Sequence, residues 1–235
     1  MPARFDLWRG LETAAGLLVS GDPEVWGIVL LSLRVSLTAT LVSLLMGVPV
    51  GSVLALTRFP GRSLLIGLVH TGMGLPPVSV GLIVSILLWR SGPLGALGLL
   101  YTPTAMIIAQ AAIATPIVIG LTLAAVQALD PQLRLQLLAL GASPLQMTWW
   151  LLREARLPLI AALVTGFGAV ISEVGAAMMV GGNIKGETRV LTTATVLEVG
   201  RGNFDVAVAL TAVLLVFTYS VNLTLTVLQQ HRRSW

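Results

Sequence analysis

The sequence has no cysteine and very few charged residues. Without cysteine the chain can form no disulfide, no thiolate metal site and no cysteine nucleophile. Charged residues make up 10% of the 235 residues, against about a quarter in soluble domains. Only two histidines are present, and they lie far apart, so neither a metal centre nor an intramembrane catalytic site is expected. The remaining composition, 56% hydrophobic, is typical of a membrane protein.

The hydrophobic residues are gathered in long runs without charge. Asp, Glu, Lys and Arg are absent from residues 35–57, 63–89, 91–129 and 206–230, and Glu173 alone interrupts 157–181. Roughly 20 apolar residues span the hydrocarbon as a helix, and the short alternating strands of a membrane barrel are missing. We therefore expect an all-α integral membrane protein with five transmembrane helices, at about 28–56, 64–89, 104–128, 158–180 and 206–228.

Both ends of the chain lie outside these spans. Residues 1–24 carry an apolar stripe at helical spacing opposite polar residues, which predicts an N-terminal interfacial helix lying on membrane lipid. Residues 229–235 form a short basic tail. Five spans put the termini on opposite sides, but Lys and Arg divide seven to six between the sides, so charge bias barely decides the orientation. The net charge of +4 is interpreted as basic loops at the membrane surface, not as affinity for nucleic acid.

The long connection at 130–157 has the pattern of two short helices. Asp130-Pro131 is a cap followed by a first-turn proline, Gly141 interrupts the helix, and Ser143-Pro144 starts a second one. A pair of short amphipathic helices outside the bilayer favours docking into a groove of a partner protein. An ordinary interfacial connection is the alternative. The candidate docking residues are Gly141, Ala142, Ser143, Pro144 and Leu145.

The segment "LALGASPLQ" within this connection resembles the glycine-centred cytoplasmic loop of type 1 ABC-importer permeases. Two departures are visible. The Glu-Ala-Ala of that loop falls on Leu135-Gln136-Leu137, and its closing Leu-Pro, due thirteen residues after the glycine, is replaced by Leu157-Pro158 about one helical turn later. The resemblance implies that residues 130–157 couple the chain to an ATPase subunit. The C-terminus would then be cytoplasmic and the N-terminus outside.

A second stretch, "GFGAVISEVGAAMMVGGNIKGETRVLTTA" from Gly166 to Ala194, resembles the oxyanion branch of these permeases. Its "EVGAAMMVGGNI" with "TRVLTTA" is similar to tungstate permeases in particular, as is "SGDPEVWGIVLLSLRVSLTAT" near the N-terminus. Residues 25–228 are thus expected to form one type 1 transmembrane domain. The likeness implies a non-catalytic subunit in the cytoplasmic membrane of a prokaryote, for tungstate, molybdate or sulfate.

The same resemblance implies partners. Two copies of the chain would form the pore, ATPase subunits would bind ATP and Mg²⁺, and an extracytoplasmic oxyanion-binding protein would deliver the ion. No cofactor is expected in this chain. An alternative of another class is an ATPase-independent secondary anion transporter, which usually has more intramembrane acids or an inverted internal repeat; neither is seen here.

The stretch after residue 180 loosely matches a phosphate-binding P-loop. Glu187 stands where the P-loop lysine would be, and a membrane helix precedes the stretch in place of a buried strand, so the match is accidental. Unwound backbone at membrane depth indicates a translocation pathway, with cations and hydroxyls, those of Thr188 and Thr195 included, as donors to an anion. A plain solvated loop is the alternative. The candidate pathway and gate residues are Glu173, Gly175, Gly181, Gly182, Asn183, Lys185, Arg189, Thr192 and Thr193.

Glu173 is the costliest of these residues to place in a membrane. Its carboxylate would repel a dianion, so we expect it to act as a helix-to-helix lock or gate and not as a ligand. Arg34, the only other charge inside a predicted span, is its candidate partner; alternatively Arg34 reaches for the outer interface.

Overall fold

The computed structural model describes residues 12, 16 and 20–231. Most of the predicted interfacial helix at 1–24 and the last four residues of the tail lie outside the described residues. Every regular element in the described part is helical, which confirms the predicted all-α class. In chain order the helices are α2 (Pro23–Leu56), α3 (Arg62–Met73), α4 (Pro77–Leu88), the 3₁₀ turn η1 (Gly95–Leu97), α5 (Pro103–Gln127), α6 (Pro131–Ala139), α7 (Pro144–Glu154), α8 (Arg156–Ile171), α9 (Gly175–Gly181), α10 (Leu191–Gly200) and α11 (Phe204–His231).

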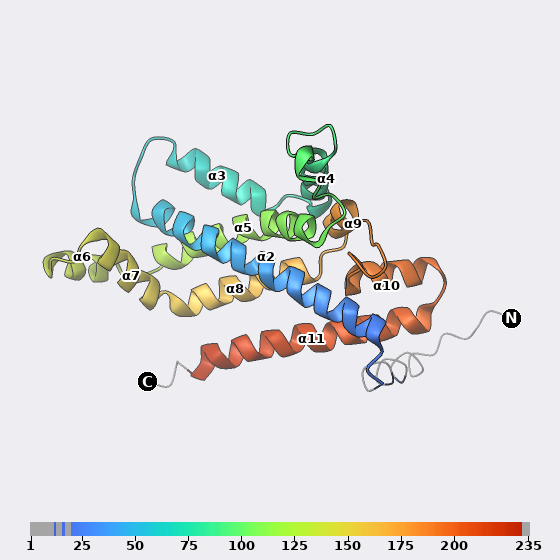
Figure 1. Ribbon diagram of the computed structural model, residues 1–235. Coiled ribbons are helices and arrows are strands. Elements are labelled where there is room, and N and C mark those ends of the chain that lie inside the picture. Colours follow the sequence, from blue (N-terminus) through green and yellow to red (C-terminus); the bar gives the residue numbers. More distant parts are fainter. Residues whose placement is uncertain (1–11, 13–15, 17–19, 232–235) are drawn as a thin grey trace.

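The long helices α2 and α5 lie side by side at the centre of the bundle (Figure 1). Each starts at a proline preceded by a capping side chain. The Asp22 carboxylate accepts a hydrogen bond from the Glu24 amide at 2.8 Å, and the Thr102 hydroxyl accepts one from the Ala105 amide at 3.3 Å. The side chain accepts amide protons that have no partner inside the helix, and proline lacks such a proton.

Two glycines let α2 and α5 approach closely. A Cβ atom at Gly47 would lie 2.7 Å from Val118 Cγ1, and one at Gly51 would lie 2.7 Å from the carbonyl oxygen of Ile119. Beside them, the buried Ser43 hydroxyl donates to the Ala111 carbonyl across the interface at 3.2 Å. Small residues spaced four apart are how membrane helices bring their backbones into contact, because lipid supplies no hydrophobic force between them.

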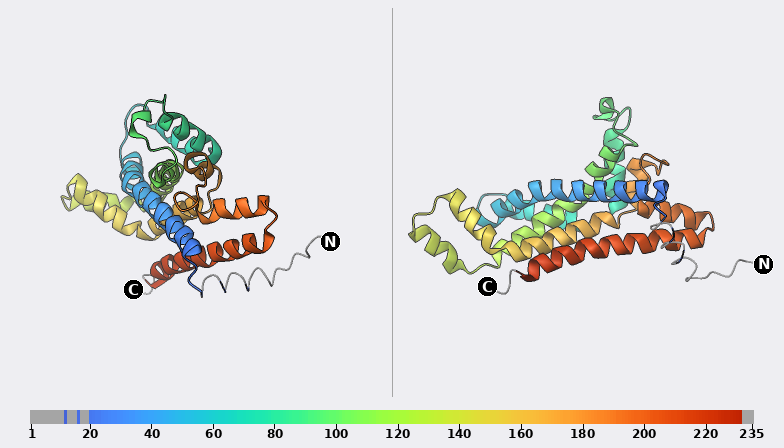
Figure 2. Two further views of the ribbon diagram at one scale, coloured as in Figure 1. Left: turned by 45° about the vertical axis from the view of Figure 1, so that its right-hand side comes forward. Right: turned by 60° about the horizontal axis from the view of Figure 1, so that its bottom comes forward.

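The predicted span at 64–89 is not one straight helix. α3 and α4 meet at 103°, with Pro76 and Pro77 at the break. Pro77 has no amide proton and cannot continue the ladder of α3, so a new helix begins there. Figure 2 shows α4 and the loop after it standing away from the long helices.

The predicted span at 158–180 is also broken. Helix α8 ends at Ile171, and residues 172–174 separate it from the short helix α9. At its other end α8 meets α7 at a 71° bend. Within the described residues, three helices are individually long and apolar enough to cross a membrane, namely Pro23–Leu56, Pro103–Gln127 and Phe204–Thr224, and two bent pairs could cross as one span each.

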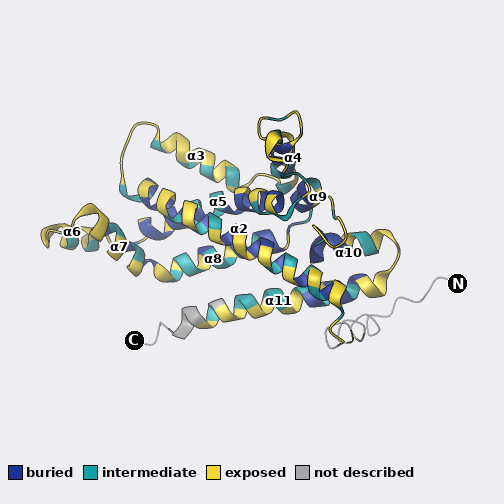
Figure 3. Ribbon diagram, viewed as in Figure 1, coloured by how far each residue is buried: buried dark blue, intermediate teal, exposed yellow. Residues whose placement is uncertain are grey.

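The bundle has two distinct ends. Helices α6 and α7 project at one end, beside the last turns of α2 and α11, while α9, α10 and the start of α2 lie at the other (Figure 1). Large apolar side chains such as Leu30, Leu45 and Leu215 are exposed along the helices, and Figure 3 shows this exposure running the length of the bundle. Such a surface faces lipid or another membrane subunit.

Candidate translocation and coupling sites

Glu173 lies at the break between α8 and α9. Its carboxylate oxygen Oε1 accepts a hydrogen bond from the Ala176 amide at 2.8 Å, so the side chain caps the first turn of α9. The residue is only 8% exposed. Its backbone carbonyl accepts a hydrogen bond from the Thr192 hydroxyl at 2.9 Å, which ties α10 to the same point. Glu173 is therefore a local lock that joins three helices.

The predicted pair between Glu173 and Arg34 is wrong. Within the described chain, neither side chain takes part in an ion pair, and the one hydrogen bond of the Glu173 carboxylate goes to the backbone of α9. The capping geometry explains this result: an amide three residues ahead is close enough to compensate the buried carboxylate, and no second helix is needed.

We expect Glu173→Ala to lower the thermal unfolding temperature, whereas Glu173→Gln should keep most of the stability because the amide oxygen can still cap α9. Loss of a cap costs about 1 kcal/mol, or about 2–4 °C for a chain of this size. Thermal unfolding in detergent measures both. Ser172→Ala is the neighbouring control, since its exposed hydroxyl bonds only within α8. Equal damage from Gln and Ala would show that the charge matters and the cap does not.

The predicted glycines have two different tasks. Gly175 and Gly181 are packing positions, where an added Cβ would clash with Val78 and lie 2.9 Å from the Met106 sulfur, respectively. Gly181 is thus the last residue of α9 and not a point of unwinding. The chain leaves the helix at Gly182, which has a left-handed φ of +71°, and Asn183 follows with φ +53°. Left-handed backbone favours glycine and tolerates asparagine, so the helix ends where these two meet.

The loop after Gly182 is folded around a buried threonine. The Thr188 hydroxyl donates to the Gly181 carbonyl at 2.5 Å and accepts from the Ile184 amide at 3.0 Å. The Ile184 carbonyl in turn accepts hydrogen bonds from the backbone amides of Glu187, Thr188 and Arg189. This loop is therefore an ordered part of the fold, although residues 184–187 are exposed.

The threonine hydroxyls are already used within the protein. Thr193 caps α10, accepting from the Val190 amide at 3.1 Å and donating to the Val190 carbonyl at 3.1 Å. Thr192 and Thr195 donate to the carbonyls of Glu173 and Leu191. The side-chain amide of Asn183 donates to the Thr193 carbonyl at 3.3 Å. Among the predicted pathway residues, the cationic side chains are therefore the strongest donors left for an anion.

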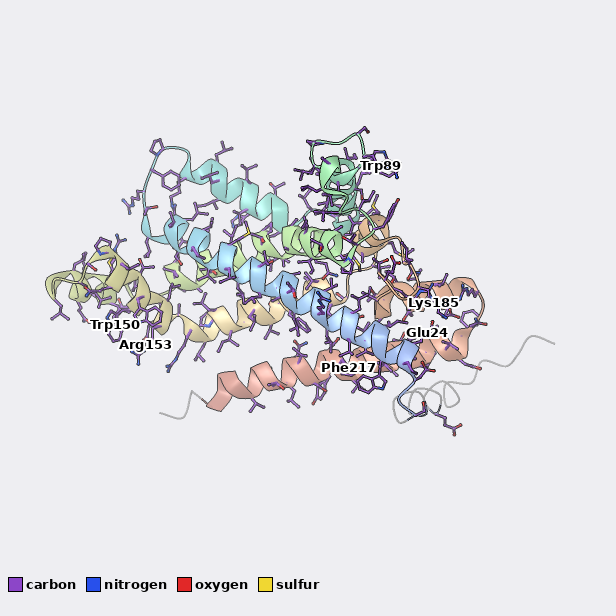
Figure 4. All side chains as sticks on the ribbon, viewed as in Figure 1. Glu24, Trp89, Trp150, Arg153, Lys185 and Phe217 are labelled. Carbon is purple, nitrogen blue, oxygen red and sulfur yellow. The ribbon has the colours of Figure 1, made fainter. Side chains whose placement is uncertain are left out.

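The cationic residues of the loop face the start of α2. Lys185 Nζ lies 2.7 Å from a carboxylate oxygen of Glu24, and Arg189 Nη1 lies 3.9 Å from the other. Figure 4 shows Glu24 and Lys185 pointing toward one another. A cavity of about 550 Å³ opens at this contact, and Arg34 also lines it. The structure thus brings Lys185 and Arg189 together, and adds Arg34 and Glu24, which the sequence pattern did not connect with the loop.

The predicted coupling loop has the expected form at the opposite end. Asp130 caps α6, Gly141 is left-handed with φ +74°, and Ser143 and Gln146 form a reciprocal capping box at the start of α7. Ala142 and Pro144 complete the turn into α7. Leu145 is 82% exposed, and Trp149 is exposed further along α7, whereas Met147 and Leu151 face the bundle. This arrangement leaves an apolar face of α7 exposed.

Two further contacts stabilise this end. The Arg153 guanidinium lies 5.0 Å from the centre of the Trp150 ring (Figure 4). Arg134 on α6 donates to the Leu56 carbonyl at the end of α2 at 3.3 Å. The Leu56 carbonyl lies in the last turn of α2, so it has no amide partner within that helix. The coupling loop is thereby attached to the central helix.

The apolar bundle has a broken helix with a cavity rich in cations at one end and an exposed helix pair at the other, features that agree with a membrane permease. Residues 47–234 match the family described as "Binding-protein-dependent transport system inner membrane component". The chain belongs to this family, the permeases of ABC importers, as the sequence motifs predicted.

The relatives place the chain within that family. It is 42% identical over 222 residues to the tungstate uptake system permease protein TupB of Peptoclostridium acidaminophilum, covering 94% of this chain and 97% of that one. It is 30% identical over 185 residues to the molybdenum transport system permease protein ModB of Escherichia coli (strain K12), covering 75% and 80%. The fold is similar to that of an inward-facing MetNI methionine ABC transporter, with a TM-score of 0.73 at 20% identity over 89% of this chain and 98% of that one. The predicted likeness to oxyanion permeases is confirmed.

Proposed function

We propose that this chain is the membrane-spanning subunit of an ATP-driven importer for tungstate. Two copies form the pore, ATPase subunits dock on α6 and α7, and an extracytoplasmic binding protein delivers the ion to the opposite end. The observation that carries the proposal is the arrangement of the two ends: an exposed apolar helix face for a partner at one, and a cationic cavity at the other. This arrangement suits transport driven from one side of the membrane.

The side chains indicate which steps of transport this chain carries out and which its ATPase partner carries out. The chain is proposed to hold neither ATP nor Mg²⁺, because Glu187 occupies the place of a phosphate-binding lysine and would repel phosphate. ATP binding by the partner would move α7, and α7 is continuous with α8 through the bend at Ala155, which is fully buried. Movement of α8 would reach Glu173, since this residue follows the end of α8 and caps α9. Alternating access would follow from this chain of contacts.

The proposed orientation places α6, α7 and the C-terminal end in the cytoplasm and the N-terminus outside. The choice of tungstate rests on the similarity to TupB, and molybdate or sulfate is the alternative within the same class. Tungstate and molybdate have the same charge and tetrahedral form, and a pore must release its ion. Selectivity is therefore proposed to reside mainly in the binding protein.

ATP hydrolysis tests this function directly. The chain is reconstituted in lipid with its ATPase and binding protein, and tungstate, molybdate and sulfate are added at equal low concentrations. We expect tungstate to stimulate hydrolysis above the other two ions. Equal stimulation by molybdate would contradict the assigned substrate while keeping the class. Anion flux in the absence of any ATPase would replace the proposal by a secondary transporter.

A further inference from the structure

The cavity at the start of α2 carries an excess of positive charge. It lies between the first half of α2, the start of α5 and the loop after α9, and three cations and two carboxylates line it. Its volume of about 550 Å³ is many times the share of one water molecule, so a hydrated ion fits. The charged residues are Glu24, Arg34, Lys185, Glu187 and Arg189.

Two long helices begin at this cavity. Pro23 and Pro103, the first residues of α2 and α5, both line it. The amino-terminal end of a helix carries the positive end of its dipole and favours an anion close by. Asp22 already caps the start of α2, so the start of α5 and the three cations are what favour an anion with several oxygen acceptors.

Arg189 is held in position with an unused donor. Its side chain is 14% exposed, and its Nη2 donates to the Asn183 carbonyl at 3.4 Å. Its Nε is buried and has no hydrogen-bond partner among the described residues. A buried donor without a partner is costly, so Arg189 would gain from an acceptor in the cavity that its side chain moves to meet.

Arg34 is a cation for which no polar partner is found among the described residues. It lies ten residues beyond Glu24 on the cavity face of α2, about 15 Å further along the helix. No hydrogen bond or ion pair joins it to another described residue. A guanidinium inside a spanning helix usually faces a partner or a water-filled path, because hydrocarbon does not solvate it.

Glu24 occupies the place that an oxyanion would take at Lys185 and Arg189. A carboxylate and a tetrahedral oxyanion accept the same charge-assisted hydrogen bonds from these two side chains. We propose that the cavity is an oxyanion site in which Glu24 holds the cations until the ion displaces it, and that Arg34 receives the ion further along α2. This inference rests on the proposed function. Glu24 and Glu187 keep the affinity low, so that the ion leaves.

Equilibrium binding of radiolabelled tungstate to the permease–ATPase complex tests the site, in nanodiscs of uncharged lipid without ATP or binding protein. Because Glu24→Gln removes the competing carboxylate, we expect about tenfold tighter binding, together with slower ATP-driven uptake. Arg34→Gln should weaken binding about tenfold. Asp205→Asn and Arg90→Gln make the same charge changes outside the cavity and should leave binding unchanged.

Arg34 contacts no other described side chain through a polar bond, so its replacement should leave folding intact, and Arg34→Lys should restore part of the binding. The inference would be overturned if the cavity variants bound tungstate as tightly as their controls do, or if neither the wild type nor Glu24→Gln bound it at all. In both cases ATP-driven uptake by the wild type would leave the proposed function standing. A wild-type complex that tungstate never stimulates would remove the proposed function itself.

A lipid phosphate presents the same tetrahedral oxygens. The measurements are therefore repeated with phosphatidylglycerol in the nanodiscs. Arg34→Gln could bind tungstate as tightly as the wild type in uncharged lipid and differ from it only when phosphatidylglycerol is present. Arg34 would then be a lipid contact, and the inference would be wrong.

Discussion

Replacing Gly51 by alanine is expected to lower the thermal unfolding temperature of the chain by about 5 °C or more and to reduce the yield of monodisperse protein. A Cβ atom at this position would lie 2.7 Å from the backbone carbonyl oxygen of Ile119 and 2.7 Å from Thr122 Cβ. Neither atom is at the end of a flexible side chain, so α2 and α5 would have to separate. Overpacking of this kind costs about 1–3 kcal/mol, and the α2–α5 contact is the most extensive in the bundle.

Gly27→Ala is the matched control, because Gly27 lies on the same helix and a Cβ there would meet nothing within 4 Å. Alanine favours helix over glycine, so this variant should be as stable as the wild type or slightly more so. Thermal unfolding followed by size-exclusion chromatography in detergent compares the two. Equal unfolding temperatures for both variants would show that α2 and α5 do not pack as closely as described.

Local signals in the sequence predicted the helix starts well. Asp130-Pro131 begins α6 and Ser143-Pro144 begins α7 as expected, because a cap and a first-turn proline act within four residues. The left-handed Gly141 was predictable for the same reason. Such features depend on nearest neighbours and not on the rest of the fold.

The breaks within the spans were harder to predict. No charged residue marks a break within residues 64–89, and a pair of prolines kinks a helix by an amount that only packing decides. At 158–180 the unusual residue was Glu173, which was singled out but given the wrong partner. The chain alone does not reveal that Glu173 can satisfy its carboxylate on α9, three residues away, at the cost of ending α8.

The candidate site also combines residues that the local sequence predicted with contacts that it did not predict. Lys185 and Arg189 were found from their sequence neighbourhood, but the carboxylate that faces them is about 160 residues earlier, at the start of α2. No pattern in the sequence around Glu24 pointed to a contact with the loop after α9. The spacing of Gly47 and Gly51 was a signal of close packing that was present and not used.

Leu145→Glu is expected to abolish docking of the ATPase while leaving the permease folded. Leu145 is 82% exposed on the first turn of α7, so its replacement removes no contact within the bundle. In a complex the same position would be an apolar anchor. Loss of an anchor, with a carboxylate buried in its place, weakens an interface by at least about a hundredfold. Co-purification and ATPase-coupled uptake of tungstate would both be lost.

Leu145→Met separates the chemistry from the shape, since it keeps an apolar side chain of similar volume and should keep both activities. The unfolding temperature of the isolated permease should be the same for the two variants. Met147, two residues further, faces the bundle instead. Met147→Glu should therefore lower the unfolding temperature, a result that distinguishes the two faces of α7. If Leu145→Glu still assembled and transported normally, α7 would be an interfacial connection, and the ATPase would have to bind elsewhere on the chain.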